Sequence, residues 1–155
     1  MSDVVILITV LGASAISVGL IIALNAWLGG WTPRRFATLK DAARAIEDQV
    51  FGFDPSEDGV LARGGRAALI VERGGGRLGL ATTAGDRAIV RALRPGELQG
   101  VSLEGSTLTL TLGDYTFPKA WLTFEDAATA SIWAERAEGF AVRPEGAGAK
   151  RASHA

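Results

Sequence analysis

Residues Thr107–Leu112 read TLTLTL, the strictest alternation of polar and apolar side chains in the sequence. Successive side chains of a β-strand point to opposite faces, so Leu108, Leu110 and Leu112 share one face and the threonines share the other. One face then packs on a core while the other meets water, as is typical of antiparallel sheets. The stretch predicts a half-buried strand in a mainly β domain.

Turn signals recur on either side of this strand about every ten residues, the spacing of an all-β meander. They are Gly64-Gly65, Gly74-Gly75-Gly76, Gly85-Asp86, Pro95-Gly96, Glu104-Gly105 and Gly113-Asp114. Between and around them the sequence predicts strands at Val60–Arg63, Ala67–Glu72, Leu78–Thr83, Ala88–Leu93, Leu98–Leu103, Thr107–Leu112 and Tyr115–Phe124. Pro118 restricts the last of these to an edge or a bulge. We expect a seven-stranded antiparallel meander or partly open barrel.

Two helices flank the strands. Thr38-x-x-Asp41 matches a capping box, and an amphipathic stripe follows it up to Val50. This stripe is expected to pack on the domain. A second capping box, Thr123-x-x-Asp126, predicts a C-terminal helix that runs to about Glu138 and buries Trp133.

The N-terminal segment predicts a membrane-spanning helix. Val4–Leu28 contains no charged residue, and as a helix it rises about 37 Å against roughly 30 Å of hydrocarbon. Met1-Ser2-Asp3 lacks the basic start of a signal peptide, so we expect an uncleaved anchor. Trp27 and Trp31 follow at the expected interface with water.

The flanking charges predict the orientation of this helix. Asp3 precedes it, whereas Arg34, Arg35, Lys40 and Arg44 follow it. Because positive flanks stay cytoplasmic, the domain is expected in the cytoplasm of a bacterial cell, on the inner membrane, with the N-terminus outside. The alternative is a domain on the outer side, carried by a helix of opposite orientation.

Small residues line one face of the predicted helix: Gly12, Ala15, Gly19, Ala23 and Ala26. Such a face lets membrane helices approach closely, which predicts packing against a partner helix or a second copy. The alternative is that alanine and glycine are simply common in such helices.

Composition narrows the function. The net charge is −1 and there is no cysteine, so we expect no nucleic-acid partner and no thiolate chemistry. The single histidine, His154, lies in the polar tail, and we expect no catalytic set, no metal and no cofactor. The residues therefore favour a protein that is not an enzyme.

Two glycine-containing motifs have simpler interpretations. Gly74–Gly79 matches the dinucleotide pattern GxGxxG, but a strand rather than a helix follows it, which predicts a hairpin turn and no nucleotide. Asp54–Gly59 resembles the start of a calcium loop, but Gly65 occupies the place of the bidentate glutamate. We expect a loop that leaves the preceding helix.

Seven short strands followed by a helix with a central tryptophan give an order of elements that resembles pleckstrin-homology-like domains. The resemblance spans about Asp58 to Glu138 and implies lipid binding, peptide binding or scaffolding. Lipid-binding members carry basic residues in and beside the first hairpin loop. The positions that match here are Arg63, Arg66, Arg73 and Arg77.

The sequence thus divides into an anchor (1–31), a linker with an amphipathic helix (32–57), a β domain (58–138) and a tail expected to be disordered (139–155). The leading hypothesis is a membrane accessory or scaffold protein that docks on a partner membrane protein. The alternative is a membrane-tethered sensor that binds lipid headgroups or a peptide.

Overall fold

The computed structural model describes residues 2–28 and 33–142. They form two compact units, an N-terminal helix and a domain that begins at Arg34. The helices are α1 (Ser2–Trp27), α2 (Leu39–Gln49) and α3 (Ala127–Glu138), with one 3-10 turn, η1 (Arg63–Gly65). The strands are β1 (Pro55–Leu61), β2 (Ala67–Glu72), β3 (Leu78–Ala84), β4 (Arg87–Leu93), β5 (Leu98–Glu104), β6 (Thr107–Leu112) and β7 (Lys119–Thr123).

Helix α1 is long and apolar enough to cross a membrane. Its 26 residues rise about 39 Å, and none of them is buried. Within it, the hydroxyls of Thr9 and Ser17 donate to the carbonyl oxygens of Val5 and Ala13, at 2.8 and 2.9 Å. These two polar side chains therefore satisfy their hydrogen-bonding needs inside the helix. Trp31 lies outside the described residues.

The seven antiparallel strands form two sheets, ordered β1-β2-β3-β4 and β5-β6-β7. The chain passes from one sheet to the other at Arg94–Glu97, where the Glu97 amide donates to the Arg94 carbonyl at 3.0 Å and Gly96 has φ +88°. That geometry is a type II turn with glycine at its third position. The predicted antiparallel strands are confirmed, but they divide at this turn instead of continuing as one meander.

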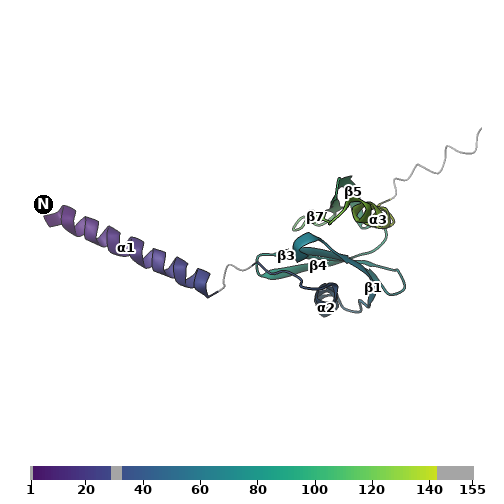
Figure 1. Cartoon of the computed structure of the whole chain (residues 1–155), viewed down its shortest axis with the longest axis horizontal. Coiled ribbons are helices and arrows are strands. Elements are labelled where there is room, and N and C mark those ends of the chain that lie inside the picture. The colour runs from purple at the N-terminus through teal and green to yellow at the C-terminus, as the bar shows by residue number, and fades with distance from the viewer. Residues whose placement is uncertain (1, 29–32, 143–155) are drawn as a thin grey trace, which may run out of the picture. The chain divides into compact units, whose positions relative to one another are not determined.

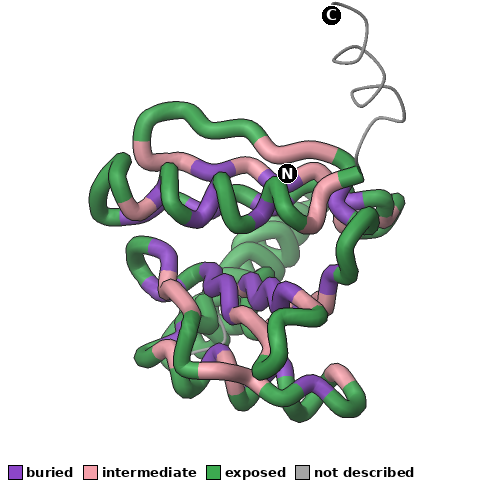
Figure 2. The backbone as a smooth tube through the Cα atoms, turned by 90° about the vertical axis from the view of Figure 1, so that its right-hand side faces the viewer, coloured by how far each residue is buried: buried purple, intermediate pink, exposed green. Residues whose placement is uncertain are grey.

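The main core lies between the two sheets and α3 (Figure 2). It joins Leu69, Leu80 and Leu110 from the strands to Trp133 from α3. Leu110 and Trp133 are 0% and 5% exposed, so both predicted core positions are confirmed. Arg136 lies over the Trp133 ring, 4.8 Å from its centre.

A second cluster lies on the other face of the four-stranded sheet, where α2 packs (Figure 1). Ala42, Ala45 and Ile46 of α2 are buried there. Gly79 of β3 provides the space, because a Cβ on it would approach the side chains of Ile46 and Phe53 to 2.8 Å. The capping box at Thr38 and Asp41 is confirmed, and α2 is part of the domain.

The chain enters the domain through a short strap, Arg34–Phe36, bonded to two loops. The Arg34 amide donates to the Gly85 carbonyl and the Phe36 amide to the Gly65 carbonyl, each at 2.7 Å. Phe36 is 3% exposed in the α2 cluster. A Cβ on Gly65 would overlap the carbonyl oxygen of Phe36. The residues from Arg34 onward are therefore fixed to the domain, where a linker was expected.

Several predicted boundaries differ from the structure, and strand β7 begins at Lys119 rather than at Tyr115. Strand β1 begins at Pro55, not Val60, and its register shifts between Pro55 and Gly59. Thr123 ends β7, so the second predicted capping box is wrong: Asp126 is the N-cap of α3 and accepts the Thr129 amide at 2.6 Å.

The predicted tail begins too early. Ala141 pairs with Leu98 of β5, and the Val142 amide donates to the Leu98 carbonyl at 2.7 Å. The chain therefore remains attached to the β5 edge as far as Val142. The rest of the predicted tail, 143–155, lies outside the described residues, and His154 with it.

Candidate binding surfaces

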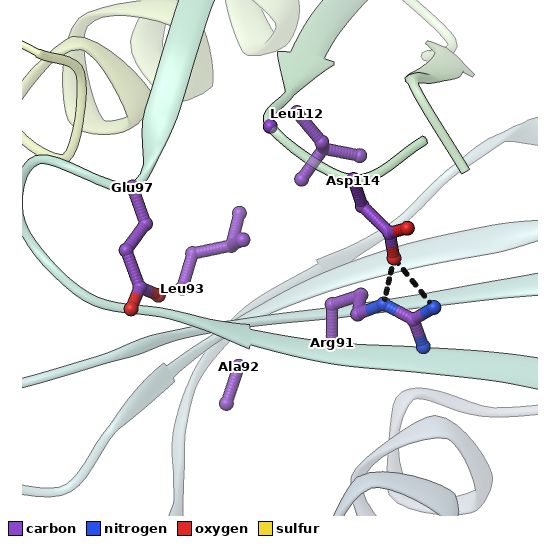
Figure 3. Close-up of a pocket in the computed structure, with 7 residues that line it drawn as sticks. Arg91, Ala92, Leu93, Glu97, Leu112 and Asp114 are labelled. Atoms are coloured by element: carbon purple, nitrogen blue, oxygen red, sulfur yellow. Dashed lines mark hydrogen bonds and ion pairs between the residues drawn. The ribbon is translucent and has the colours of Figure 1, made fainter. Parts of the chain in front are cut away.

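A pocket of about 290 Å³ lies where the free edge of β4 meets the end of β6. Leu93 and Leu112 give it an apolar wall, while Glu97 lies at one side and the Arg91–Asp114 pair at the other (Figure 3). Arg91 donates to one oxygen of Asp114 through Nε at 2.9 Å and Nη2 at 2.7 Å. This ion pair links β4 of the four-stranded sheet to the segment that follows β6 of the three-stranded sheet.

The electrostatics of Asp114 follow from its contacts. The hydroxyl and the amide of Thr116 donate to its second oxygen at 2.6 and 2.8 Å. Together with Arg91, these bonds hold the pKa of the Asp114 carboxyl well below its usual range. Through these bonds Asp114 connects the segment after β6 to β4 and fixes the rim of the pocket.

A second hollow of about 240 Å³ adjoins the first and shares Leu112, Gly113 and Asp114 with it. Tyr115 and Lys119 line its other side. Tyr115 is fully exposed, and Trp121 is 64% exposed on β7. Since alternate residues of a strand share a face, Trp121 lies beside Lys119 on the outer face of this sheet. We call Tyr115, Lys119 and Trp121 the aromatic rim.

The four arginines predicted as a headgroup or peptide site do not come together. Arg63 and Arg66 precede β2, whereas Arg73 and Arg77 follow it, at the opposite end of a six-residue strand. Such a strand spans about 17–20 Å. The two pairs therefore cannot hold one phosphate group between them.

Three of these four arginines already have carboxylate partners. Arg63 lies 4.0 Å from Glu125, and Arg73 lies 3.0 Å from Asp54. Arg77 pairs with Glu72, and this bond raises the pKa of the guanidinium and lowers that of the Glu72 carboxyl. Arg77 also bonds the Gly52 carbonyl and lies over Phe53, so it fixes the loop that follows α2.

The strap gathers a different set of arginines. It bonds the η1 loop at Gly65 and the β3–β4 turn at Gly85, which brings Arg34, Arg35, Arg66 and Arg87 to one end of the four-stranded sheet. All four are exposed, and none has an ion pair among the described residues. We call them the strap-end arginines. The sequence suggested no such grouping, because only the fold brings positions 34, 66 and 87 together.

The predicted packing face of α1 is open along its length. A Cβ on Gly12 or Gly19 would meet nothing within 4 Å, and Ala15, Ala23 and Ala26 are exposed.

The two glycine-containing motifs lie in strands and turns. Gly74 and Gly75 form the turn of the β2–β3 hairpin, as predicted, and Gly79 lies within β3. The prediction that the calcium-like stretch forms a helix-exit loop is wrong. Pro55–Gly59 belongs to β1, and Asp58 pairs with Arg136. In residues 2–28 and 33–142, no three His, Asp or Glu side chains are grouped to hold a metal.

Comparison with known proteins found no matching family model, curated protein or solved structure.

Proposed function

We propose that this chain is a non-enzymatic accessory or scaffold protein of the bacterial inner membrane, docked on a partner membrane protein. The observation that carries the proposal is the aromatic rim. Tyr115 and Lys119 line a groove that adjoins the apolar pocket beside β4, and Trp121 is exposed two residues further along β7. Tyrosine and tryptophan are the residues that most often dominate the binding energy of protein interfaces.

The groove suits a protein partner. Leu93 and Leu112 offer an apolar recess for one side chain, and Lys119 and Glu97 give charges of both signs at its margin. Strands β4 and β7 each have a neighbouring strand on one side only within their sheets, so an extended segment of a partner can bond along either edge. We further propose that the domain is pleckstrin-homology-like, which its order of four strands, three strands and a helix supports.

Helix α1 contributes a second contact in this proposal. Its Gly12, Ala15, Gly19, Ala23 and Ala26 face packs on a partner helix, the domain lies in the cytoplasm and the N-terminus lies outside. Arg34, Arg35, Lys40 and Arg44 support this orientation. A sensor of lipid headgroups or peptides acting through Arg63, Arg66, Arg73 and Arg77 is less supported, because the fold separates these residues.

Affinity purification of the full chain in mild detergent tests the proposal. Trp121→Ala and Tyr115→Ala should each deplete the captured membrane protein at least tenfold, which is about 1.4 kcal/mol of binding energy. Phe51→Ala is the matched control, since Phe51 is as exposed as Tyr115 but lies in the loop after α2. If all three variants capture the same amount of the membrane protein, the aromatic rim does not bind that protein.

The helix is tested separately. Gly19→Leu should leave the protein in the membrane but release the partner, whereas Leu20→Ile, a volume-conserving change off the small face, should do neither. Unchanged copurification with Gly19→Leu would show that the small face only meets lipid.

A further inference from the structure

The strap end of the domain carries a concentration of positive charge that neither the fold nor the proposed docking uses. The strap-end arginines come from three separate segments: Arg34 and Arg35 from the strap, Arg66 from the η1 loop and Arg87 from the start of β4. Two strap bonds and a bond from the Thr83 amide to the Arg66 carbonyl, at 2.8 Å, hold these backbones together. None of the four side chains is engaged in an ion pair within the described part of the chain.

Neighbouring acidic groups reduce this charge only in part. Arg44 and Asp48 line a hollow with Arg34 and Arg35, and Asp41 lies there too. The carboxylate of Asp41 accepts the amide and the hydroxyl of Thr38, at 2.9 and 3.0 Å. With Asp86 of the β3–β4 turn included, this end of the domain has five arginines, the four strap-end arginines and Arg44, and three aspartates. Their net charge is +2. Since the whole chain carries −1, the rest of it carries −3.

This end is also the one that the chain ties to the helix. The seven peptide steps from Trp27 to Arg34 span at most about 25 Å when fully extended. Arg34 itself is bonded to the β3–β4 turn. With α1 inserted in a bilayer, the chain therefore keeps Arg34 within about 25 Å of Trp27, and the strap bonds keep Arg66 and Arg87 at the same end of the domain, where an anionic surface can attract them.

We infer that the strap-end arginines form a binding surface for the phosphate groups of an anionic phospholipid leaflet, which holds the domain with this end toward the bilayer. The partner is the lipid surface itself rather than one headgroup in a built pocket. The inference goes beyond partner docking and holds whether or not the aromatic rim binds a protein. It leaves the aromatic rim on β6–β7 for that partner.

The full chain in lipid nanodiscs tests this inference. The chain has no cysteine, so Ala84→Cys places one fluorophore on an exposed position beside Arg87. Phe51→Cys places a control fluorophore in the loop after α2, which Arg77 joins to the other end of the sheet. Quenching by lipids that carry a quencher near the headgroup reports how close each fluorophore lies to the bilayer.

Quenching at position 84 should rise when phosphatidylglycerol replaces phosphatidylcholine, and it should fall again at high salt. Quenching at position 51 should stay low in both lipids. Arg66→Gln with Arg87→Gln should lower the ratio of bound to unbound domain about 30-fold, the equivalent of two lost contacts of about 1 kcal/mol each. This variant keeps Arg34 and Arg35, so it leaves the orientation signal unchanged.

Arg73→Gln with Arg94→Gln removes the same charge from exposed positions at the other end of the sheet, and it should leave the quenching unchanged. If quenching at position 84 is the same with and without phosphatidylglycerol, the inference is wrong. An equal loss with the two double variants would also overturn it, because the attraction would then depend on total charge alone.

Discussion

Gly65 and Gly64 form a matched pair that tests whether the strap is fixed to the domain. Both lie in the η1 loop with positive φ, +67° at Gly65 and +74° at Gly64. A Cβ on Gly64 meets nothing within 4 Å, whereas a Cβ on Gly65 overlaps the carbonyl oxygen of Phe36. Alanine at the two positions therefore shares the backbone cost and differs only in its contact with the strap.

The magnitudes follow from these two terms. An L-residue in the left-handed region costs about 1–2 kcal/mol, which is the whole expected effect of Gly64→Ala. Gly65→Ala adds an overlap with backbone, for which overpacking gives about 1–3 kcal/mol more. The overlap also strains the bond from the Phe36 amide to the Gly65 carbonyl and disturbs Phe36 in its cluster.

Two separate measurements on the full chain in detergent micelles compare the variants. Urea unfolding gives the free energy of unfolding, and hydrogen exchange gives the protection of the amides in the folded domain. Gly65→Ala should lower the free energy of unfolding more than Gly64→Ala, and it alone should speed exchange at the Phe36 amide. Equal destabilisation by the two variants, with protection of Phe36 unchanged, would show that the strap is not docked on this loop.

Three further predictions concern the core, the acid range and the sheet junction. Leu110→Ala should destabilise the domain by about 2–5 kcal/mol and Trp133→Ala by about 3–5 kcal/mol in the same urea titration, because both side chains are buried between the sheets and α3. The pKa of Asp114 is depressed in the folded state, first by Thr116 and then by Arg91, so its stabilisation is present above its unfolded pKa of about 3.9 and is lost as the pH falls below it. Asp114→Asn should therefore lower stability at neutral pH and flatten the loss in acid, and an unchanged acid profile would contradict this. Arg91→Gln should also lower stability at neutral pH, since it removes the ion pair between the sheets, but it should flatten the loss in acid less than Asp114→Asn, because the Thr116 bonds to Asp114 remain.

Periodicity predicted the strands well where one face is buried and the other is wet. Thr107–Leu112 alternates strictly, and its bounds as a strand match the prediction. Periodicity failed at the start of β1, because Pro55–Gly59 is polar and has a register shift, so neither an apolar run nor an alternation marks it. Asp126 was misassigned because two residues with capping side chains lie three apart, and only the path of β7 decides which of them begins the helix.

The binding surfaces were harder to predict from the sequence than the strands were. Arg66 and Arg87 lie far from Arg34 in the chain, and two backbone bonds of the strap bring them together. The four arginines that a resemblance grouped by their closeness in sequence lie at both ends of β2, because consecutive loops of an antiparallel hairpin lie at opposite ends. The exposed Tyr115 and Trp121 were the one signal of the aromatic rim that the sequence offered, as large aromatic residues among threonines and a lysine.

The orientation of the chain in the membrane is the most direct test of the account. In spheroplasts, a membrane-impermeant maleimide should label Ser2→Cys without permeabilisation, because the proposed orientation puts the N-terminus outside. It should label Phe51→Cys, on a fully exposed side chain of the domain, only after the membrane is opened. Labelling of Phe51→Cys in intact spheroplasts would place the domain outside the cell and contradict the cytoplasmic scaffold proposed here.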